Sequence, residues 1–143
     1  MILFCDTSAL VKLYIVEAGS DLVKRSAAQA ETIAACRITW AEAHAAFARR
    51  VREVPKDAAA LGQAKRAFAV DWPRYAVLDV DQALVEQAAE FADTFALRAY
   101  DSIQLAAAFE TASVTQLPTV FACFDARLNK AAKVLGMSCL PEA

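Results

Sequence analysis

Short apolar segments alternate with longer amphipathic segments along the whole chain, and this alternation limits the folds that the chain can adopt. The apolar segments are predicted as strands at 2–5, 33–38, 75–80, 119–124 and 138–140. The segments between them have helical periodicity, at 7–16, 20–30, 40–53, 57–71, 81–95, 102–113 and 126–135. Strands that are separated by helices indicate an α/β fold, with a central parallel sheet of four to five strands covered by about seven helices.

The composition agrees with one covered sheet in a single domain that spans residues 1–143. Hydrophobic residues make up 58% of the 143 residues, above the ~45–50% of an average soluble domain. A sheet covered on both faces accounts for such an excess, which can also supply an oligomer or partner surface. No apolar stretch reaches the ~18 residues of a membrane span, and Asp6 interrupts the first one. We therefore expect a cytoplasmic protein that has no contact with a membrane.

Several common catalytic and binding motifs are absent from the sequence. The three glycines form neither a dinucleotide-binding nor a P-loop motif. The only histidine, His44, lies two residues from Glu42, so on a helix the two side chains point in different directions. We interpret His44 as a packed or surface residue. The four cysteines lack the clustering of a zinc site and are predicted to be small hydrophobic residues buried in strands: Cys5, Cys36, Cys123 and Cys139.

Carboxylates follow two of the predicted strands directly. Asp6 comes after the first strand, and Asp125 comes after the strand at 119–124. Open α/β sheets bind their ligands at the carboxyl ends of parallel strands. The sequence therefore predicts that these two acids share one charged pocket.

Two further carboxylates lie at the starts of predicted helices. Glu42 follows the strand at 33–38, and Asp101 precedes the helix at 102–113. A purely structural interpretation is also open, because Thr39-x-x-Glu42 has the spacing of a capping box and Asp101-x-x-Gln104 resembles one. Asp6 and Asp125 can likewise be helix N-caps. The four acids at compatible sheet-end positions nevertheless favour a joint function.

The order and surroundings of these acids resemble the PIN-domain nucleases, and specifically the VapC-type toxins of type II toxin–antitoxin systems. The resemblance covers essentially the whole chain. Four segments carry it, in order and at ordinary spacing: Phe4–Tyr14 with Glu17, Thr39–Glu42, Leu97–Ala106, and Phe124–Ala132 with Leu135-Gly136. Two positions depart from the family pattern: Gln104 stands where the family often has histidine, and Cys123 stands where it often has threonine or serine.

The resemblance implies a PIN-like three-layer fold and a metal-dependent endoribonuclease. Asp6 and Asp101 would be the main metal ligands, and Glu42 and Asp125 would complete the site directly or through water. Ser8 would donate a hydrogen bond to one of these acids. Hard oxygen ligands suit Mg²⁺, with Mn²⁺ as the alternative ion.

The resemblance also implies an RNA substrate, such as tRNA or rRNA, and two protein partners. These partners are a cognate VapB-type antitoxin, which would form a hetero-oligomer with the chain, and a second copy in a homodimer. The net charge of −2 gives no global attraction to RNA. Local basic side chains would have to hold the phosphate backbone, and the candidates are Lys12, Arg49, Arg50 and Arg52. The alternative for the arginines is a solvated helix end that complements the helix dipole.

Two other functional classes stay open. A receiver-type phosphoacceptor domain also has acids at strand ends and binds Mg²⁺. It would carry paired acids after the first strand and a lysine after the last one, whereas Asp6 stands alone here. The second alternative is a nuclease fold that binds RNA or protein without cleaving, and the loss of one of the four acids would favour it.

Overall fold

The computed structural model describes residues 1–142, which form a five-stranded parallel sheet between two layers of helices. The strands are β1 (Ile2–Cys5), β2 (Thr32–Cys36), β3 (Ala76–Leu78), β4 (Thr119–Ala122) and β5 (Ser138–Leu140). The α-helices are α1 (Thr7–Leu10), α2 (Ser20–Gln29), α3 (Thr39–Glu53), α4 (Ala58–Asp71), α5 (Gln82–Phe95), α6 (Ala99–Thr115) and α7 (Ala126–Val134). Three short 3₁₀ helices complete the set, at Val11–Leu13, Pro55–Asp57 and Trp72–Arg74. The predicted α/β class and the parallel sheet are confirmed.

The strand order is β3-β2-β1-β4-β5, and every neighbouring pair is parallel. From β1 the chain builds outward to β2 and β3, and it then crosses back to place β4 on the other side of β1. The order therefore reverses between β1 and β4. In open α/β sheets this switch point leaves a crevice at the carboxyl ends of the two strands, where ligands bind.

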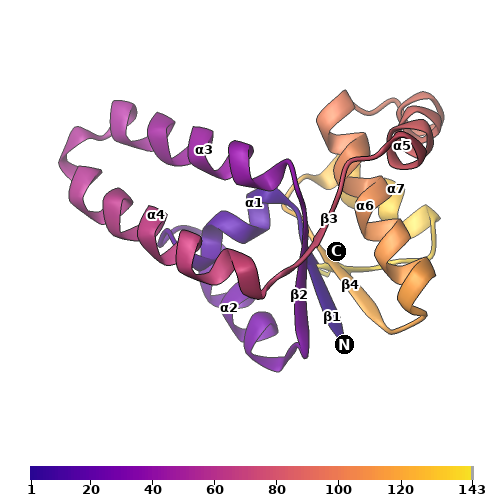
Figure 1. Cartoon of the computed structure of the whole chain (residues 1–143), viewed down its shortest axis with the longest axis horizontal. Coiled ribbons are helices and arrows are strands. Elements are labelled where there is room, and N and C mark those ends of the chain that lie inside the picture. The colour runs from indigo at the N-terminus through magenta and orange to yellow at the C-terminus, as the bar shows by residue number, and fades with distance from the viewer. Residues whose placement is uncertain (143) are drawn as a thin grey trace.

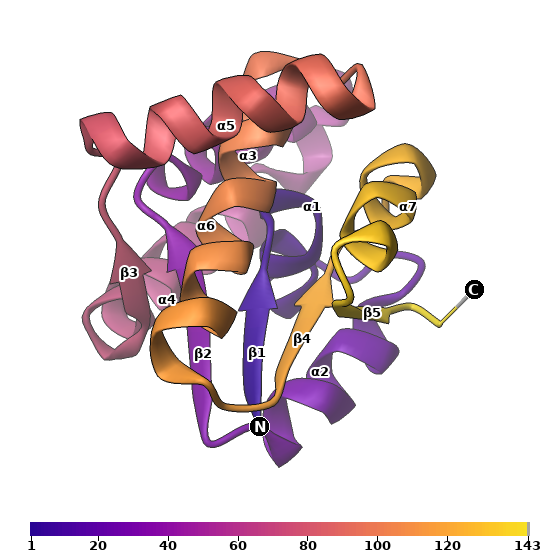
Figure 2. The same cartoon turned by 90° about the vertical axis from the view of Figure 1, so that its right-hand side faces the viewer.

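Alternating strand residues build a separate core on each face of the sheet. Ile2 and Phe4 pack toward α5, α6 and α7, whereas Leu3 and Cys5 pack toward α1, α2, α3 and α4. Figure 1 shows the two helical layers on opposite sides of the sheet, with the α3–α4 hairpin projecting away from it. Figure 2 shows that the arrowheads of β1, β2 and β4 point to the same edge, where α1 begins.

Aromatic packing joins α3 to α4. Phe68 is fully buried, and Trp40 stacks on it with ring centroids 5.2 Å apart. His44 lies within 5.7 Å of the same ring, and its Nδ1 is 2.6 Å from the carbonyl oxygen of Trp40. His44 is thus a packed residue, as predicted. All four cysteines are also free and buried, as the sequence indicated.

Five predicted elements had a boundary that was wrong by two residues or more. The strands predicted at 75–80 and 119–124 end at Leu78 and Ala122. The helix predicted at 7–16 becomes 3₁₀ after Leu10 and ends at Leu13, because a helix end often tightens in this way. The helix predicted at 102–113 begins earlier, at Ala99, so Asp101 lies in its first turn instead of capping it. The strand predicted at 33–38 ends at Cys36, and Ile38 already has helical backbone angles.

The helix caps separate the four acids into two pairs. Asp6 and Asp125 are N-caps, as the structural interpretation predicted: Asp6 accepts from the amide of Ala9, and Asp125 accepts from those of residues 127 and 128. The two capping-box interpretations are wrong, because neither α3 nor α6 has a side-chain cap. The side chains of Glu42 and Asp101 are therefore not used by the ends of their own helices.

No helix among residues 1–142 combines the length and the apolar character that crossing a membrane requires.

Replacing Gly19 with alanine is expected to destabilise the fold by about 1–3 kcal/mol. Gly19 has a φ of +90°, and an added Cβ would lie 2.6 Å from Cε1 of Phe124. Gly62→Ala is the matched control, since Gly62 lies within α4 and its added Cβ would meet nothing closer than 3.6 Å. That control should gain roughly 0.5–1 kcal/mol. Urea unfolding of the two variants measures both effects, and equal stabilities would contradict the close approach of Gly19 to Phe124.

Candidate active site

Asp6 occupies the switch point of the sheet. Its backbone N–H donates to the carbonyl oxygen of Ala122 at the end of β4, at 3.0 Å, and its side chain is only 6% exposed. One carboxylate oxygen, Oδ1, accepts from the hydroxyl of Ser8 at 2.7 Å and from the amide of Ala9 at 3.0 Å. Burial raises the pKa of Asp6 to about 6, despite these hydrogen bonds. The fold thus holds a carboxylate where its charged form is costly.

Two further carboxylates, those of Asp101 and Asp125, lie close enough for electrostatic repulsion to raise pKa values in the site. The charge of Asp101 contributes to the raised pKa of Asp6. Burial, followed by the charge of Asp125, raises the pKa of Asp101, although the guanidinium of Arg98 opposes the effect. The structure therefore brings Asp6, Asp101 and Asp125 to one edge of the sheet, from the β1–α1 junction, α6 and the β4–α7 junction. We call these three residues the acid cluster.

Glu42 lies beside the acid cluster, in the first turn of α3. Its Oε1 accepts from the hydroxyl of Thr7, the residue after Asp6, at 2.8 Å. The same oxygen accepts from the side-chain amide of Gln104 at 2.9 Å. The Glu42 carboxylate is thus fixed by one donor from α1 and another from α6.

Gln104 is the residue whose role the sequence did not reveal. It is 3% exposed, and its Nε2 also donates to the hydroxyl oxygen of Thr39 at 2.9 Å. Its Oε1 is buried without a hydrogen-bond partner among the described residues. A buried polar atom without a partner is costly. All the hydrogen bonds of this side chain are made by its Nε2, which joins Thr7, Thr39 and Glu42. The sequence offered two signals for this position: the spacing of three residues from Asp101 and the departure from the histidine that the family often has there.

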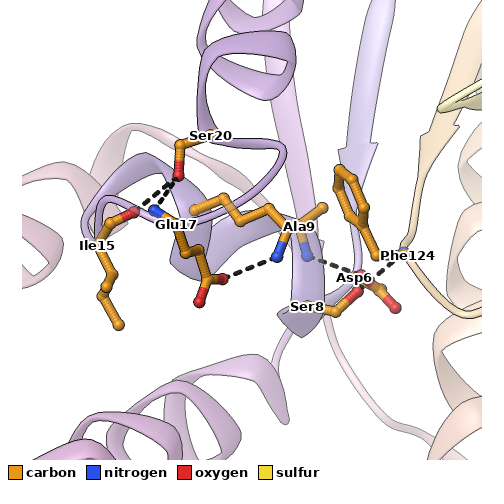
Figure 3. Close-up of polar contacts among 8 residues, drawn as sticks. Asp6, Ser8, Ala9, Ile15, Glu17, Ser20 and Phe124 are labelled. Carbon is orange, nitrogen blue, oxygen red and sulfur yellow. Dashed lines mark hydrogen bonds and ion pairs between the residues drawn. The ribbon is translucent and has the colours of Figure 1, made fainter.

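Ser8 connects the two strand ends, as Figure 3 shows. Its hydroxyl donates to Asp6 and accepts from the backbone N–H of Phe124 at 3.1 Å. Phe124 immediately precedes Asp125. At the neighbouring position, the amide of Asp125 donates to Sγ of Cys123 at 3.3 Å. A sulfur atom thus occupies the place where the family often has a hydroxyl.

The predicted RNA-binding side chains are mostly engaged in ion pairs. Arg49 pairs with Glu53 at 3.0 Å, and Arg50 pairs with Asp57 at 3.4 Å. Lys12 pairs with Glu17 at 2.7 Å and is only 12% exposed. Arg52 is exposed on the same helix end. Because a helix rises 1.5 Å per residue, the three arginines lie about 10–15 Å along α3 from Glu42.

The donor set of the site fits a hard divalent cation. It consists of carboxylate oxygens, which Mg²⁺ and Mn²⁺ prefer, and none of the four acids forms an ion pair within residues 1–142. Their present side-chain positions do not converge on one point: among the described residues, no three histidine, cysteine, aspartate or glutamate side chains are close enough to hold a metal ion. The chemistry and the negative charge are in place, whereas a coordination shell is not.

Comparison with known proteins gives a family match over most of the chain. The family model for the PIN domain matches residues 3–134. The chain is 27% identical over 140 residues to ribonuclease VapC45 of Mycobacterium tuberculosis (strain CDC 1551 / Oshkosh), a match that covers 98% of this chain and 95% of the relative.

Two solved structures share the fold. One is VapC20 of Mycobacterium tuberculosis, a toxin that cleaves the sarcin–ricin loop, with a TM-score of 0.63, 20% identity, and coverage of 90% of this chain and 94% of the other. The second is a toxin–antitoxin complex from Klebsiella pneumoniae, with a TM-score of 0.56, 18% identity and coverage of 84% of each chain. At these identities the likeness concerns the fold.

Proposed function

Because the chain belongs to the PIN-domain family, we propose that it is a metal-dependent endoribonuclease and the toxin component of a type II toxin–antitoxin module. The family match leaves a non-cleaving PIN domain that binds RNA or protein as the alternative, and it removes support for a receiver-type domain. All four acids are present, as cleavage requires. The similarity to ribonuclease VapC45 supports the activity.

One observation carries this proposal: the fold buries Asp6 at the switch point of the sheet, next to the charge of Asp101. A buried carboxylate without a cationic side chain costs stability. The fold does not need that charge for its N-cap, since asparagine caps a helix equally well. A carboxylate kept at such a cost is typical of a site with a chemical role.

The four acids would have different roles in binding the metal ion, according to their positions. Asp6 and Asp101 would hold a Mg²⁺ or Mn²⁺ ion, and Glu42 and Asp125 would complete the site directly or through water. A bound divalent cation supplies charge neutralisation at the scissile phosphate and lowers the pKa of a coordinated water. Ser8 orients Asp6 by donating to its Oδ1. Thr7 and Gln104 both donate to Oε1 of Glu42, which restrains the direction of that carboxylate.

Gln104→Leu is expected to lower the cleavage rate by about 10–100-fold, the usual cost of losing a residue that orients a metal ligand. Leucine keeps the buried volume but removes the donor to Glu42 and Thr39. Gln82→Leu, at an exposed position of α5, is the control and should cleave at the wild-type rate. Steady-state cleavage of a fluorescent RNA would measure both variants, and a Gln104→Leu rate within twofold of wild type would contradict the role of this network.

RNA, with tRNA or rRNA as the substrate class, is the proposed target. Arg49, Arg50 and Arg52 would hold its phosphate backbone along the end of α3, after exchange of two surface ion pairs that are individually weak. Single-stranded or loop RNA fits better than a regular duplex, because the deep groove of A-form RNA hides the base edges.

A cognate VapB-type antitoxin is the proposed partner, in a hetero-oligomer that also contains a homodimer of this chain. The fold shared with the Klebsiella pneumoniae complex supports this partner. An apolar helix of the antitoxin would fit a groove of about 540 Å³ between the 3₁₀ helix Val11–Leu13 and α4. Its apolar lining includes Leu13, Ile15, Val16, Leu61, Ala64 and Ala67. Val16 is 83% exposed at the rim of this groove.

Cleavage of RNA by the purified, antitoxin-free protein tests the proposed function. The substrates would be tRNA and rRNA fragments, each incubated with Mg²⁺, with Mn²⁺ and with EDTA. We expect discrete products with either ion, their loss in EDTA, and their return when Mg²⁺ is added in excess. Products that persist in EDTA would point to a contaminating nuclease. Intact RNA in every lane, from protein that is folded by circular dichroism, would favour the non-cleaving alternative.

A further inference from the structure

The contacts of Lys12 conflict with a role in binding RNA. Its ammonium group lies 2.7 Å from Oε1 of Glu17 and is mostly buried. It also lies 4.5 Å from the centre of the Phe124 ring, within the range of a cation–π interaction. A cation that already has an anionic and an aromatic partner is poorly available to phosphate.

The turn between the 3₁₀ helix and α2 is shaped to present Glu17 to Lys12. Ser20, which is 3% exposed, donates to the carbonyl oxygen of Ile15 at 2.9 Å and accepts from the amide of Glu17 at 3.0 Å. Figure 3 shows these two bonds closing the turn. Gly19 then brings backbone against the Phe124 ring, since an added Cβ would lie 2.6 Å from that ring and 3.2 Å from the Lys12 side chain.

Phe124 connects this turn to the acid cluster. Its backbone N–H donates to Ser8, and the Ser8 hydroxyl in turn donates to Asp6. The residue after Phe124 is Asp125. A shift of the Phe124 ring would therefore disturb two of the three acids, one through a hydrogen bond and the other through the chain itself.

We infer that Lys12 and Glu17 are positioning residues of the proposed nuclease, which hold Phe124 in place and thereby set the separation of Asp6 and Asp125. The inference rests on the proposed function only in its effect on cleavage. The ordering of the β4–α7 junction by the Lys12–Glu17 ion pair follows from the contacts of Lys12, Phe124 and Ser8, whatever the protein cleaves. It replaces the RNA-binding role that the sequence suggested for Lys12.

The decisive variants are Glu17→Gln and Lys12→Met, which remove one charge each and keep the approximate side-chain size. Their controls are Asp79→Asn and Arg37→Met, because Arg37 and Asp79 form a comparable ion pair at 2.7 Å that is exposed to solvent. Amide hydrogen exchange over residues 121–128 would report the order of the Phe124 amide. We expect exchange there to become about tenfold faster in Glu17→Gln and Lys12→Met and to stay unchanged in both controls.

Two further readouts separate positioning from RNA binding. Positioning predicts Mn²⁺ affinity about tenfold weaker, as for other residues that support metal ligands, and a lower kcat with an unchanged salt dependence of KM. An RNA contact predicts a higher KM and a salt slope smaller by about one, with metal affinity and exchange as in wild type. That second pattern would overturn the inference, as would wild-type exchange over 121–128 in Glu17→Gln.

The exchange measurement also keeps this inference distinct from the proposed function. If the wild-type protein cleaves no RNA while exchange accelerates as expected, the proposed function fails and the ordering role of the pair stands. If Lys12→Met does not fold, Glu17→Gln carries the test, because it removes the charge of the ion pair and keeps the size of a side chain that lies at the surface turn.

Discussion

Asp6→Asn is expected to make the folded protein more stable at neutral pH while it abolishes RNA cleavage. Asparagine keeps Oδ1, which accepts from Ser8 and Ala9, and it removes a charge that burial disfavours. The pKa of Asp6 rises from 3.8 to about 6 on folding, and one pKa unit corresponds to 1.36 kcal/mol. The expected gain at pH 7.5 is therefore on the order of 3 kcal/mol.

The sign of the pH dependence follows from proton binding. Between pH 3.8 and about 6, folded Asp6 binds more protons than unfolded Asp6, so the stability of the wild-type protein falls as the pH rises through this window. Below this pH window the Asp6 carboxyl is neutral in the folded and the unfolded state, and above the window the loss of stability is complete. The stability difference between Asp6→Asn and wild type should be near zero at pH 3.5 and reach its maximum above pH 7.

Urea unfolding in EDTA at several pH values measures this difference. The subtraction of wild type from variant removes the contributions of all other titrating groups that the two proteins share. A variant that is less stable than wild type at pH 7.5, or a difference that does not change with pH, would show that Asp6 is not a strained carboxylate.

Asp101→Asn is expected to reduce cleavage by roughly 10²–10³-fold, the scale seen when one electrostatic group of a catalytic centre is lost. Asp101 is less buried than Asp6 and caps no helix, and burial and the charge of Asp125 raise its pKa. We therefore expect the variant to be at least as stable as wild type at neutral pH. Activity and stability are thus separated at this position. Glu31→Gln is the matched control, since Glu31 precedes β2 at the opposite edge of the sheet.

Single-turnover cleavage with excess protein would measure the chemical step of Asp101→Asn directly. The control should cleave within twofold of wild type. Cleavage by Asp101→Asn at more than about a tenth of the wild-type rate would remove this residue from the proposed metal ligands.

The fold could be predicted because it depends on local patterns. Apolar strand segments and amphipathic helices recur along the chain, and a parallel sheet is the arrangement that buries both. Asp6 could be placed at the end of β1 for the same reason, because it follows that strand directly, whereas β4 ends at Ala122 and two residues separate it from Asp125. The end of the helix at 7–16 was wrong because the change from α to 3₁₀ geometry after Leu10 leaves no mark in the apolar periodicity.

The polar network around Glu42 could not be predicted, because it is tertiary. Gln104 contacts Thr39 across 65 residues and Thr7 across 97. The spacing of Thr39 and Glu42 suggested a local capping box, whereas both side chains point to other helices. The ion pair of Lys12 could not be predicted for a related reason: a basic residue in a sequence does not reveal whether an acid five residues later already neutralises it.

The central claim is that the carboxylates of Asp6, Glu42, Asp101 and Asp125 hold a divalent cation. Isothermal titration calorimetry with Mn²⁺ tests it most directly. Wild type, Asp101→Asn and the Glu31→Gln control would be titrated under identical conditions. We expect saturable binding to wild type and to the control, and binding at least tenfold weaker to Asp101→Asn. Equal affinity of all three proteins, or no saturable binding by the folded wild-type protein, would contradict the account.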